Sequence, residues 1–179
     1  MAGTRDDVIA LLRRAAPLPS GVRVLAIDGR SGAGKTTFAA ALAPDLDGRV
    51  LAVEHLYPGW DGLEAGVDRL AEWVLRPLAA GTPVRWRRYD WLRERFGRWR
   101  ELAPAPVVVV EGVGAGARRC APYLSGLVWL EVPVAERRRR AMARDGASYA
   151  PHWDRWAAQE EHHFAANDTA ARADLVIRD

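Results

Sequence analysis

One segment in the first quarter of the chain carries the residue types needed to hold phosphate groups. It reads Gly29, Arg30, Ser31, Gly32, Ala33, Gly34, Lys35, Thr36 and Thr37. The stretch 29–36 matches the pattern G-x-x-x-x-G-K-[ST] without exception. In that pattern the glycines let the backbone curl, so that the N–H groups of residues 30–36 point at phosphate oxygens. Lys35 then adds charge to the β- and γ-phosphates, and the Thr36 hydroxyl is a ligand for Mg²⁺.

Lys35 is also the only lysine in the chain. The sequence has 26 basic residues, and all the others are arginines. At every other basic position, the chain therefore uses arginine as its positive charge. A phosphate-binding loop needs a compact ammonium on a slim stem, which arginine does not provide. The single exception to the arginine bias thus supports the phosphate-binding interpretation.

The elements around this segment have the order needed to position it. Residues 22–28 predict a buried strand, and residues 36–43 predict a helix whose N-terminal dipole favours anions. Further strands are expected at 49–54, 107–111, 127–132 and 175–177, and further helices at 4–15, 63–78, 113–121, 135–145 and 152–166. Strands that alternate with helices predict a doubly wound α/β fold with a mainly parallel, five-stranded sheet.

Two glutamates follow expected strands at the edge where the phosphate loop lies. Glu54 ends one strand and Glu111 ends the most apolar run of the chain. In open α/β sheets, ligands bind outside the carboxyl ends of the strands. Glu54 is therefore a candidate base toward an acceptor hydroxyl, and Glu111 a candidate contact to Mg²⁺ through water; a helix cap or a surface glutamate is the alternative for Glu54. Asp28, just before the loop, is expected to cap its turn.

Arginines cluster in the expected helix at 135–145. Arg137, Arg140 and Arg144 share one helical face by the i, i+3, i+7 relation. Guanidinium groups on one face suit a lid, at about residues 135–150, that closes over the triphosphate and stabilises the transferring group. Arg140 and Arg144 are the preferred catalytic candidates, and a solvated basic face is the alternative.

The segment at about residues 55–101 is expected to contact the acceptor. His55, Tyr57, Arg88 and Asp90 offer polar groups beside aromatic surface, as small-molecule sites do. Interleaved aromatics and arginines also occur in proteins that bind single-stranded nucleic acid. A net charge of +3 is too small to favour that reading. An irregular edge hairpin with exposed arginines is the other alternative.

The last expected helix carries a stripe of large side chains. The residues that recur at helical spacing are Trp153, Trp156, Ala157, Glu160 and Phe164. This spacing predicts packing against the core rather than a binding site. His162 and His163 are adjacent, so they face different directions on a helix, and no metal site is expected there.

Length and composition limit the class of protein. With 179 residues, 49% of them hydrophobic and 27% charged, the chain is expected to form one globular domain. No apolar run approaches the roughly 18 residues that span a bilayer, and the first residues do not read as a secretory signal. A single cysteine, Cys120, allows no internal disulfide. A cytoplasmic protein without membrane or nucleic-acid partners is expected.

Four segments of the chain occur in the same order in a known group of enzymes. They are residues 27–37 at the phosphate loop, residues 54–57, residues 107–112 and the arginine-bearing residues 137–145. Together they resemble the uridine kinase and phosphoribulokinase-like branch of nucleoside and nucleotide kinases, over about residues 22–178. The resemblance implies a single P-loop kinase domain over residues 1–179. Such a domain uses ATP and Mg²⁺ to phosphorylate a hydroxyl of a small molecule, with a nucleoside as one candidate acceptor.

One departure from that group concerns the catalytic carboxylate. The family carries an Asp where this chain has Glu54, and His55 follows it. The longer arm leaves open whether Glu54 or His55 takes the acceptor proton. A nucleotide-binding switch or ATPase, and an inactive relative that binds nucleotide without transfer, are the alternative functions. The identity of the acceptor stays open, and so does pairing of two copies as a homodimer.

Overall fold

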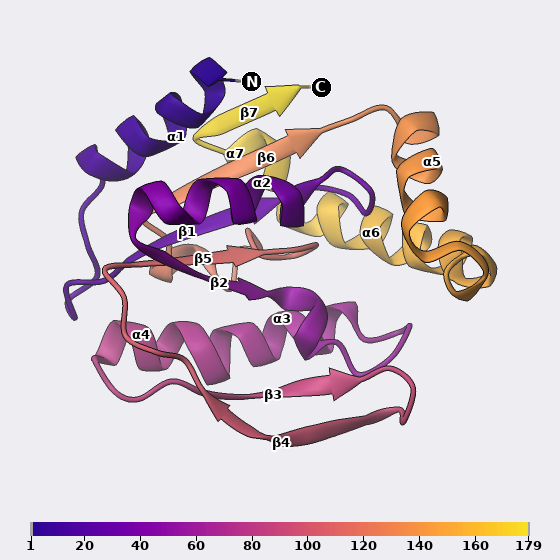
Figure 1. The fold of residues 1–179 in the computed structure, drawn as a ribbon, viewed down its shortest axis with the longest axis horizontal. Coiled ribbons are helices and arrows are strands. Elements are labelled where there is room, and N and C mark those ends of the chain that lie inside the picture. Colours follow the sequence, from indigo (N-terminus) through magenta and orange to yellow (C-terminus); the bar gives the residue numbers. More distant parts are fainter. Residues whose placement is uncertain (1, 179) are drawn as a thin grey trace.

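A five-stranded parallel sheet forms the centre of the chain in the computed structural model, which describes residues 2–178 (Figure 1). Across the sheet the order is β2 (Gly48–Ala52), β5 (Val107–Glu111), β1 (Arg23–Asp28), β6 (Gly126–Glu131) and β7 (Leu175–Arg178). Every pairing is parallel. β2 and β5 lie on one side of β1, and β6 and β7 lie on the other. The doubly wound fold expected from the sequence is therefore confirmed.

Helices connect the strands and cover both faces of the sheet. The α-helices are α1 (Ala2–Arg14), α2 (Lys35–Leu42), α3 (Leu63–Arg69), α4 (Arg76–Ala80), α5 (Val134–Asp145), α6 (Trp153–Asn167) and α7 (Thr169–Arg172). A π-helical segment, η3 (Leu70–Leu75), joins α3 to α4. The short 3₁₀ turns are η1 (Ala43–Leu46), η2 (Val53–Leu56), η4 (Ala121–Tyr123), η5 (Gly146–Ser148) and η6 (Ala150–His152). Within the described residues, none of these helices is long and apolar enough to cross a membrane.

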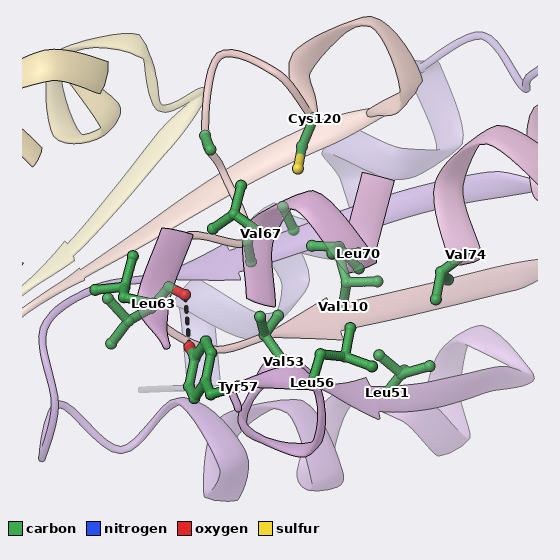
Figure 2. Close-up of a cluster of buried hydrophobic side chains, with 14 of the residues drawn as sticks. Leu51, Val53, Leu56, Tyr57, Leu63, Val67, Leu70, Val74, Val110 and Cys120 are labelled. Carbon is green, nitrogen blue, oxygen red and sulfur yellow. Dashed lines mark hydrogen bonds between the residues drawn. The ribbon is translucent and has the colours of Figure 1, made fainter. Parts of the chain in front are cut away.

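The two faces of the sheet bury alternate residues of each strand. In β1, Leu25 and Ile27 pack with residues of α1 and α2, whereas Val24 and Ala26 belong to the opposite core with α3 and η3. Figure 2 shows part of this second core, in which Val67 and Leu70 lie over the sheet. β5 is buried at every position, which explains its continuous run of valines.

A separate antiparallel hairpin, β3 (Arg85–Asp90) with β4 (Arg95–Glu101), lies outside the main sheet (Figure 1). β3 packs against η2 and η3, and Trp73 of η3 meets Phe96 edge-on with ring centroids 5.6 Å apart. The register shifts between Arg87 and Tyr89. This irregularity interrupts the period-two alternation of the hairpin, which explains why neither strand was expected from the sequence.

The expected helix at 113–121 was wrong. Most of this segment forms turns instead. Gly112 and Gly114 have φ of 140° and 85°, a backbone region that glycine enters readily and that breaks a helix. The N–H groups of Gly114 and Gly116 bond to the Asp28 carboxylate at 3.1 and 2.8 Å. Tertiary bonds to a buried aspartate therefore replace the helical ones. The other expected elements agree with the structure to within about two residues.

Candidate active site

The candidate site lies at the carboxyl edge of the sheet, where β1, β2 and β5 end. Asp28 ends β1, Glu111 ends β5, and Glu54 lies in η2 directly after β2. The loop at residues 29–34 leaves β1 at the same edge and enters α2 at Lys35. Parallel strands place all their carboxyl ends together. Groups up to 83 residues apart in sequence are thereby gathered around one loop.

Asp28 fixes the root of the loop. Its carboxylate is fully buried and accepts the Gly29 N–H at 2.7 Å, besides the N–H groups of Gly114 and Gly116. Burial raises the pKa of Asp28, and these hydrogen bonds oppose that rise. Asp28 thus caps the turn of the loop, as expected. Its bonds to Gly114 and Gly116 also connect the loop to the segment after β5.

Two glycines permit the close packing of the loop. A Cβ at Gly29 would lie 2.6 Å from the Leu130 carbonyl oxygen, and one at Gly32 would lie 2.2 Å from the Arg137 carbonyl oxygen. Both glycines have positive φ, 146° and 82°. The loop thus rests directly on the backbone of β6 and of the arginine-bearing helix α5. No side-chain-bearing residue fits at either position without a backbone shift.

Lys35 turns back into the loop. Its Nζ donates to the carbonyl oxygens of Gly29 at 2.7 Å and Arg30 at 3.0 Å, and the residue is only 8% exposed. Burial lowers the pKa of Lys35, while the negative charges of Glu160, Glu111 and Asp28 raise it. The ammonium is therefore held at the loop, next to the backbone that would surround a phosphate.

Thr36 and Glu111 form the pair expected to contact Mg²⁺. The Thr36 hydroxyl donates to Glu111 Oε1 at 3.1 Å. Burial raises the pKa of Glu111, opposed by the charge of Lys35 and by the Thr36 bond. No cluster of three or more His, Cys, Asp or Glu side chains gathers in the described residues. The pair nevertheless fits Mg²⁺, which commonly takes one or two protein oxygens and completes its shell with waters and substrate phosphates.

Glu54 and the two favoured arginines border the same edge. Glu54 is exposed, and its negative charge raises the pKa of both Glu111 and Arg144. Arg144 also pairs with Asp145 at 2.6 Å. Arg140 donates to Glu136 at 2.6 Å, and its Nη1 lies 3.8 Å from where a Cβ would stand on Gly34. Arg140 thus lies beside the loop, and Glu54 and Arg144 lie within electrostatic range of Glu111.

Of the remaining residues, Arg30 and Ala33 pack against the protein, and Thr37 is exposed. Arg30 reaches α6, where its guanidinium bonds Glu161 at 2.7 Å and lies 5.4 Å from the Phe164 ring centroid. Ala33 is buried, and Thr37 is exposed beside Thr36. These positions agree with a loop whose outer side packs on the protein and whose inner side stays accessible.

Ser31 makes three contacts that the sequence did not predict. Its N–H donates to Glu160 Oε1 at 2.6 Å, its carbonyl accepts from Arg137 Nη1 at 3.2 Å, and its Oγ lies 2.9 Å from the Tyr149 hydroxyl. Glu160 had been assigned to a packing stripe. A carboxylate on the apolar face of a Trp-rich helix was the signal that could have identified it, because a buried charge needs a partner.

The acceptor-side candidates are placed differently from one another. His55 stacks on Trp86, with centroids 5.5 Å apart. Burial first, and then the charges of Arg88 and Arg100, lower the pKa of His55 to about 4. His55 is thus neutral near pH 7 and lies against the hairpin. Arg88 is exposed on β3.

Tyr57 and Asp90 have structural contacts that use their polar atoms. The Tyr57 hydroxyl donates to the Val113 carbonyl at 2.7 Å (Figure 2), and the residue is 3% exposed. Asp90 accepts the N–H groups of Leu92 and Arg93 at 3.1 and 3.0 Å and so shapes the hairpin turn. These hydrogen bonds, that of Arg93 foremost, lower the pKa of Asp90. Substrate contact by either residue stays a prediction.

Trp60, on the acceptor side, bridges to the segment that follows α5. Its ring stacks on His152 with centroids 4.2 Å apart and on Tyr149 at 5.4 Å. The Trp91 ring, in the hairpin turn, lies 4.9 Å from the Trp60 ring, centroid to centroid. The Trp60 backbone carbonyl accepts a hydrogen bond from Gln159 Nε2 at 2.6 Å. Trp60 therefore connects the hairpin turn, the segment that follows α5, and α6.

Three solved structures that superpose on this chain carry the names of kinases. A possible uridine kinase from Bacillus stearothermophilus superposes with a TM-score of 0.67 at 21% identity, covering 98% of this chain and 99% of that one. A protein from Silicibacter sp. TM1040 named as a fructose transport system kinase gives 0.66 at 23% identity, covering 98% of both chains. The chain has the P-loop kinase fold. A shikimate kinase from Bacteroides thetaiotaomicron gives 0.50 at 17% identity, covering 87% of this chain and 86% of that one.

Sequence comparison adds no assignment to this structural likeness. No protein-family model and no curated protein matches the chain. At 17–23% identity, the likeness to the three kinases establishes the fold alone. The reaction must therefore be argued from the residues at the carboxyl edge of the sheet.

Proposed function

We propose that this chain is a kinase that moves the γ-phosphoryl group of ATP to a hydroxyl of a small molecule. The observation that carries the proposal is the convergence of Lys35, the Thr36–Glu111 pair and the arginines of α5 on one loop. Phosphoryl transfer needs little covalent chemistry from the protein, and mainly needs positioning and charge stabilisation. This set of groups suits both needs.

Each group would have a separate task. Lys35 would neutralise the β- and γ-phosphate oxygens once it leaves the carbonyls of Gly29 and Arg30. Thr36 and Glu111 would hold Mg²⁺, which supplies positive charge to the phosphates when bound. Arg140 and Arg144, in a lid at about residues 135–150, would close over the transferring group and exclude water.

Glu54 is our choice of base for the acceptor hydroxyl. It is exposed at the edge, and its charge is felt by Glu111 and Arg144. His55 is the weaker choice because it stacks on Trp86 of the hairpin. A neutral imidazole could accept a proton, but it would have to leave that stacking contact to reach a substrate at the loop.

The acceptor would lie between residues 55–101 and the lid, in a single kinase domain of the cytoplasm. The aromatic group around Trp60 offers flat contact surface there. Uridine-like nucleosides are the first class to test, since one neighbour is a possible uridine kinase. Fructose and shikimate follow from the names of the two other neighbours.

ADP release should be measured against a panel of hydroxyl-bearing metabolites, beginning with these three. We expect at least one acceptor to raise ADP release well above the rate without acceptor. A slow rate that no acceptor changes would support a nucleotide switch or ATPase. Tight nucleotide binding without any turnover would support an inactive relative.

A further inference from the structure

Ser31 is held from outside the phosphate loop at every polar group it has. Its N–H, carbonyl and hydroxyl meet Glu160, Arg137 and Tyr149 respectively. These partners come from α6, α5 and the turn between η5 and η6. A loop residue so fully engaged cannot reorient without breaking bonds to three separate segments.

Glu160 is the most tightly placed of these partners. It is 1% exposed, and the same Oε1 that accepts Ser31 N–H also accepts Trp156 Nε1–H at 3.0 Å. Burial of a carboxylate is unfavourable unless hydrogen bonds and opposite charges compensate. Burial raises the pKa of Glu160, and the charge of Lys35, the Ser31 bond and the charges of Arg137 and Arg30 oppose that rise. The carboxylate is therefore held in one orientation, facing the loop.

The direction of the Ser31 N–H changes the expected phosphate cradle. Because this group points at Glu160, it is not directed at a phosphate. The cradle is then built from the residues that follow, 32–36, whose path depends on where Ser31 is held. Gly32 comes next, and a Cβ at this position would collide with the Arg137 carbonyl.

We infer that Glu160 is a positioning residue for nucleotide binding: by fixing Ser31, it sets the curl of residues 32–36 around the phosphates. The inference rests on the proposed function, in that this loop binds nucleotide. It assigns to α6 a part in the nucleotide site that the sequence pattern of the loop does not contain.

The adjacent glutamate provides a matched control. Glu161 also bonds the loop, through Arg30 at 2.7 Å, but its side chain is 73% exposed. Exposed ion pairs contribute little because water and salt screen them. Glu161→Gln removes the same charge from the same helix as Glu160→Gln, without touching Ser31.

The test is the affinity for Mg·ADP by titration calorimetry, which needs no acceptor. Glu160→Gln should raise the Kd about tenfold, since a neutral amide weakens a charge-assisted bond to Ser31. The Kd of Glu161→Gln should stay within about twofold of the wild-type value. In the ¹⁵N-labelled protein, the Ser31 amide proton should shift upfield in Glu160→Gln alone, which reports this bond directly.

Tyr149→Phe supplies a second route if Glu160→Gln does not fold. It removes the hydroxyl bond to Ser31 Oγ, and we expect the Kd to rise about threefold. An unchanged Kd for Tyr149→Phe would overturn the role of Ser31 on this route. Where both single variants fold, the Kd of the double variant should rise less than the product of the two single effects, because both act through Ser31. Effects that simply multiply would overturn the inference.

The two hypotheses fail in different ways. If the wild-type protein binds no Mg·ADP, both the proposed function and the positioning role fall. If the wild type binds and Glu160→Gln binds equally well, only the positioning role falls. Tighter binding by Glu160→Gln would also overturn it, since the carboxylate would then act by repelling phosphate.

Discussion

The phosphate loop and the segment proposed to contact the acceptor, residues 55–101, are built in opposite ways. The loop is held by backbone and buried charge: Asp28 bonds three N–H groups, and Ser31 is bonded at every polar group. The acceptor side is held mainly by stacked rings around Trp60 and by a hairpin that carries exposed arginines.

This contrast separates two kinds of specificity. A site made from backbone groups tolerates little change, because each carbonyl or N–H is fixed by the fold. A site made from aromatic side chains can change its ligand by a few substitutions without altering the sheet. Nucleotide binding should therefore depend on the fold as a whole, and acceptor choice on individual side chains. Four predictions probe that difference.

The largest effect is expected for Lys35→Ala. Loss of the ammonium should lower kcat/KM for transfer by at least about a hundredfold, because no other group replaces its charge at the phosphates. The measurement is ADP release with the best acceptor, with circular dichroism as a check on folding. Arg13→Ala, which removes an exposed charge on α1, should retain wild-type activity. Near wild-type turnover of Lys35→Ala would refute the proposed mechanism.

The second largest effect is expected for Glu111→Gln, which should weaken Mg²⁺ binding. The Mg²⁺ concentration that gives half-maximal activity should rise about tenfold, because the amide is a poorer partner for Thr36 and for a metal-bound water. Chelation with EDTA should abolish activity in every variant. Glu131→Gln is the control, since it also sits at the end of a strand but bonds Trp129 instead. An equal rise in both variants would remove the metal role from Glu111.

Trp60→Ala tests the acceptor side. Loss of its ring contacts should raise the KM for the acceptor about tenfold, and leave the KM for ATP within about threefold. Trp99→Ala, at a ring that is 47% exposed on the hairpin, should have little effect on either constant. Equal changes in both KM values for Trp60→Ala would mean that the two regions do not divide the work as proposed.

The smallest effect concerns the pH dependence of stability. The pKa of His55 falls from 6.5 to about 4 on folding, so between these values the unfolded chain binds a proton that the folded chain does not. Stability from this residue is complete above pH 6.5 and is lost as the pH falls toward 4. The loss should be about 1 kcal/mol, after allowing for partial exposure.

Urea unfolding at pH 7 and pH 5 measures this effect. The wild-type protein should lose more stability between these pH values than His55→Gln, which has no imidazole to protonate. An identical loss in both proteins would mean that His55 is not buried neutral against the hairpin. The comparison thereby checks how firmly the acceptor side is packed.

Periodicity and composition were sufficient for most of the fold. Alternating apolar strands and amphipathic helices located the five parallel strands and the main helices, because burial on two faces leaves a strong pattern. The pattern failed where local contacts do not repeat. In the hairpin, a register shift and exposed arginines hide the alternation, and after β5 the bonds to Asp28 replace a helix.

The candidate site divides in the same manner. Lys35 and Thr36 were singled out because phosphate and Mg²⁺ chemistry requires certain residue types at a fixed spacing. Glu111 was singled out because it ends a buried strand at the same edge of the sheet. Glu160 and Tyr149 were missed, since they follow the loop by more than a hundred residues and carry no motif. Tyr57 and Asp90 had the right chemistry, but the structure uses their polar atoms for its own hydrogen bonds.

The sequence by itself determined the phosphate-binding loop and the doubly wound sheet, because both depend on local residue type and on short-range periodicity. Only the tertiary structure decided that Glu160 bonds Ser31, that His55 stacks on the hairpin and that Trp60 stacks on the segment after α5. These contacts join segments distant in sequence. Their partners depend on how helices and hairpin pack around the sheet, and no spacing along the chain records that.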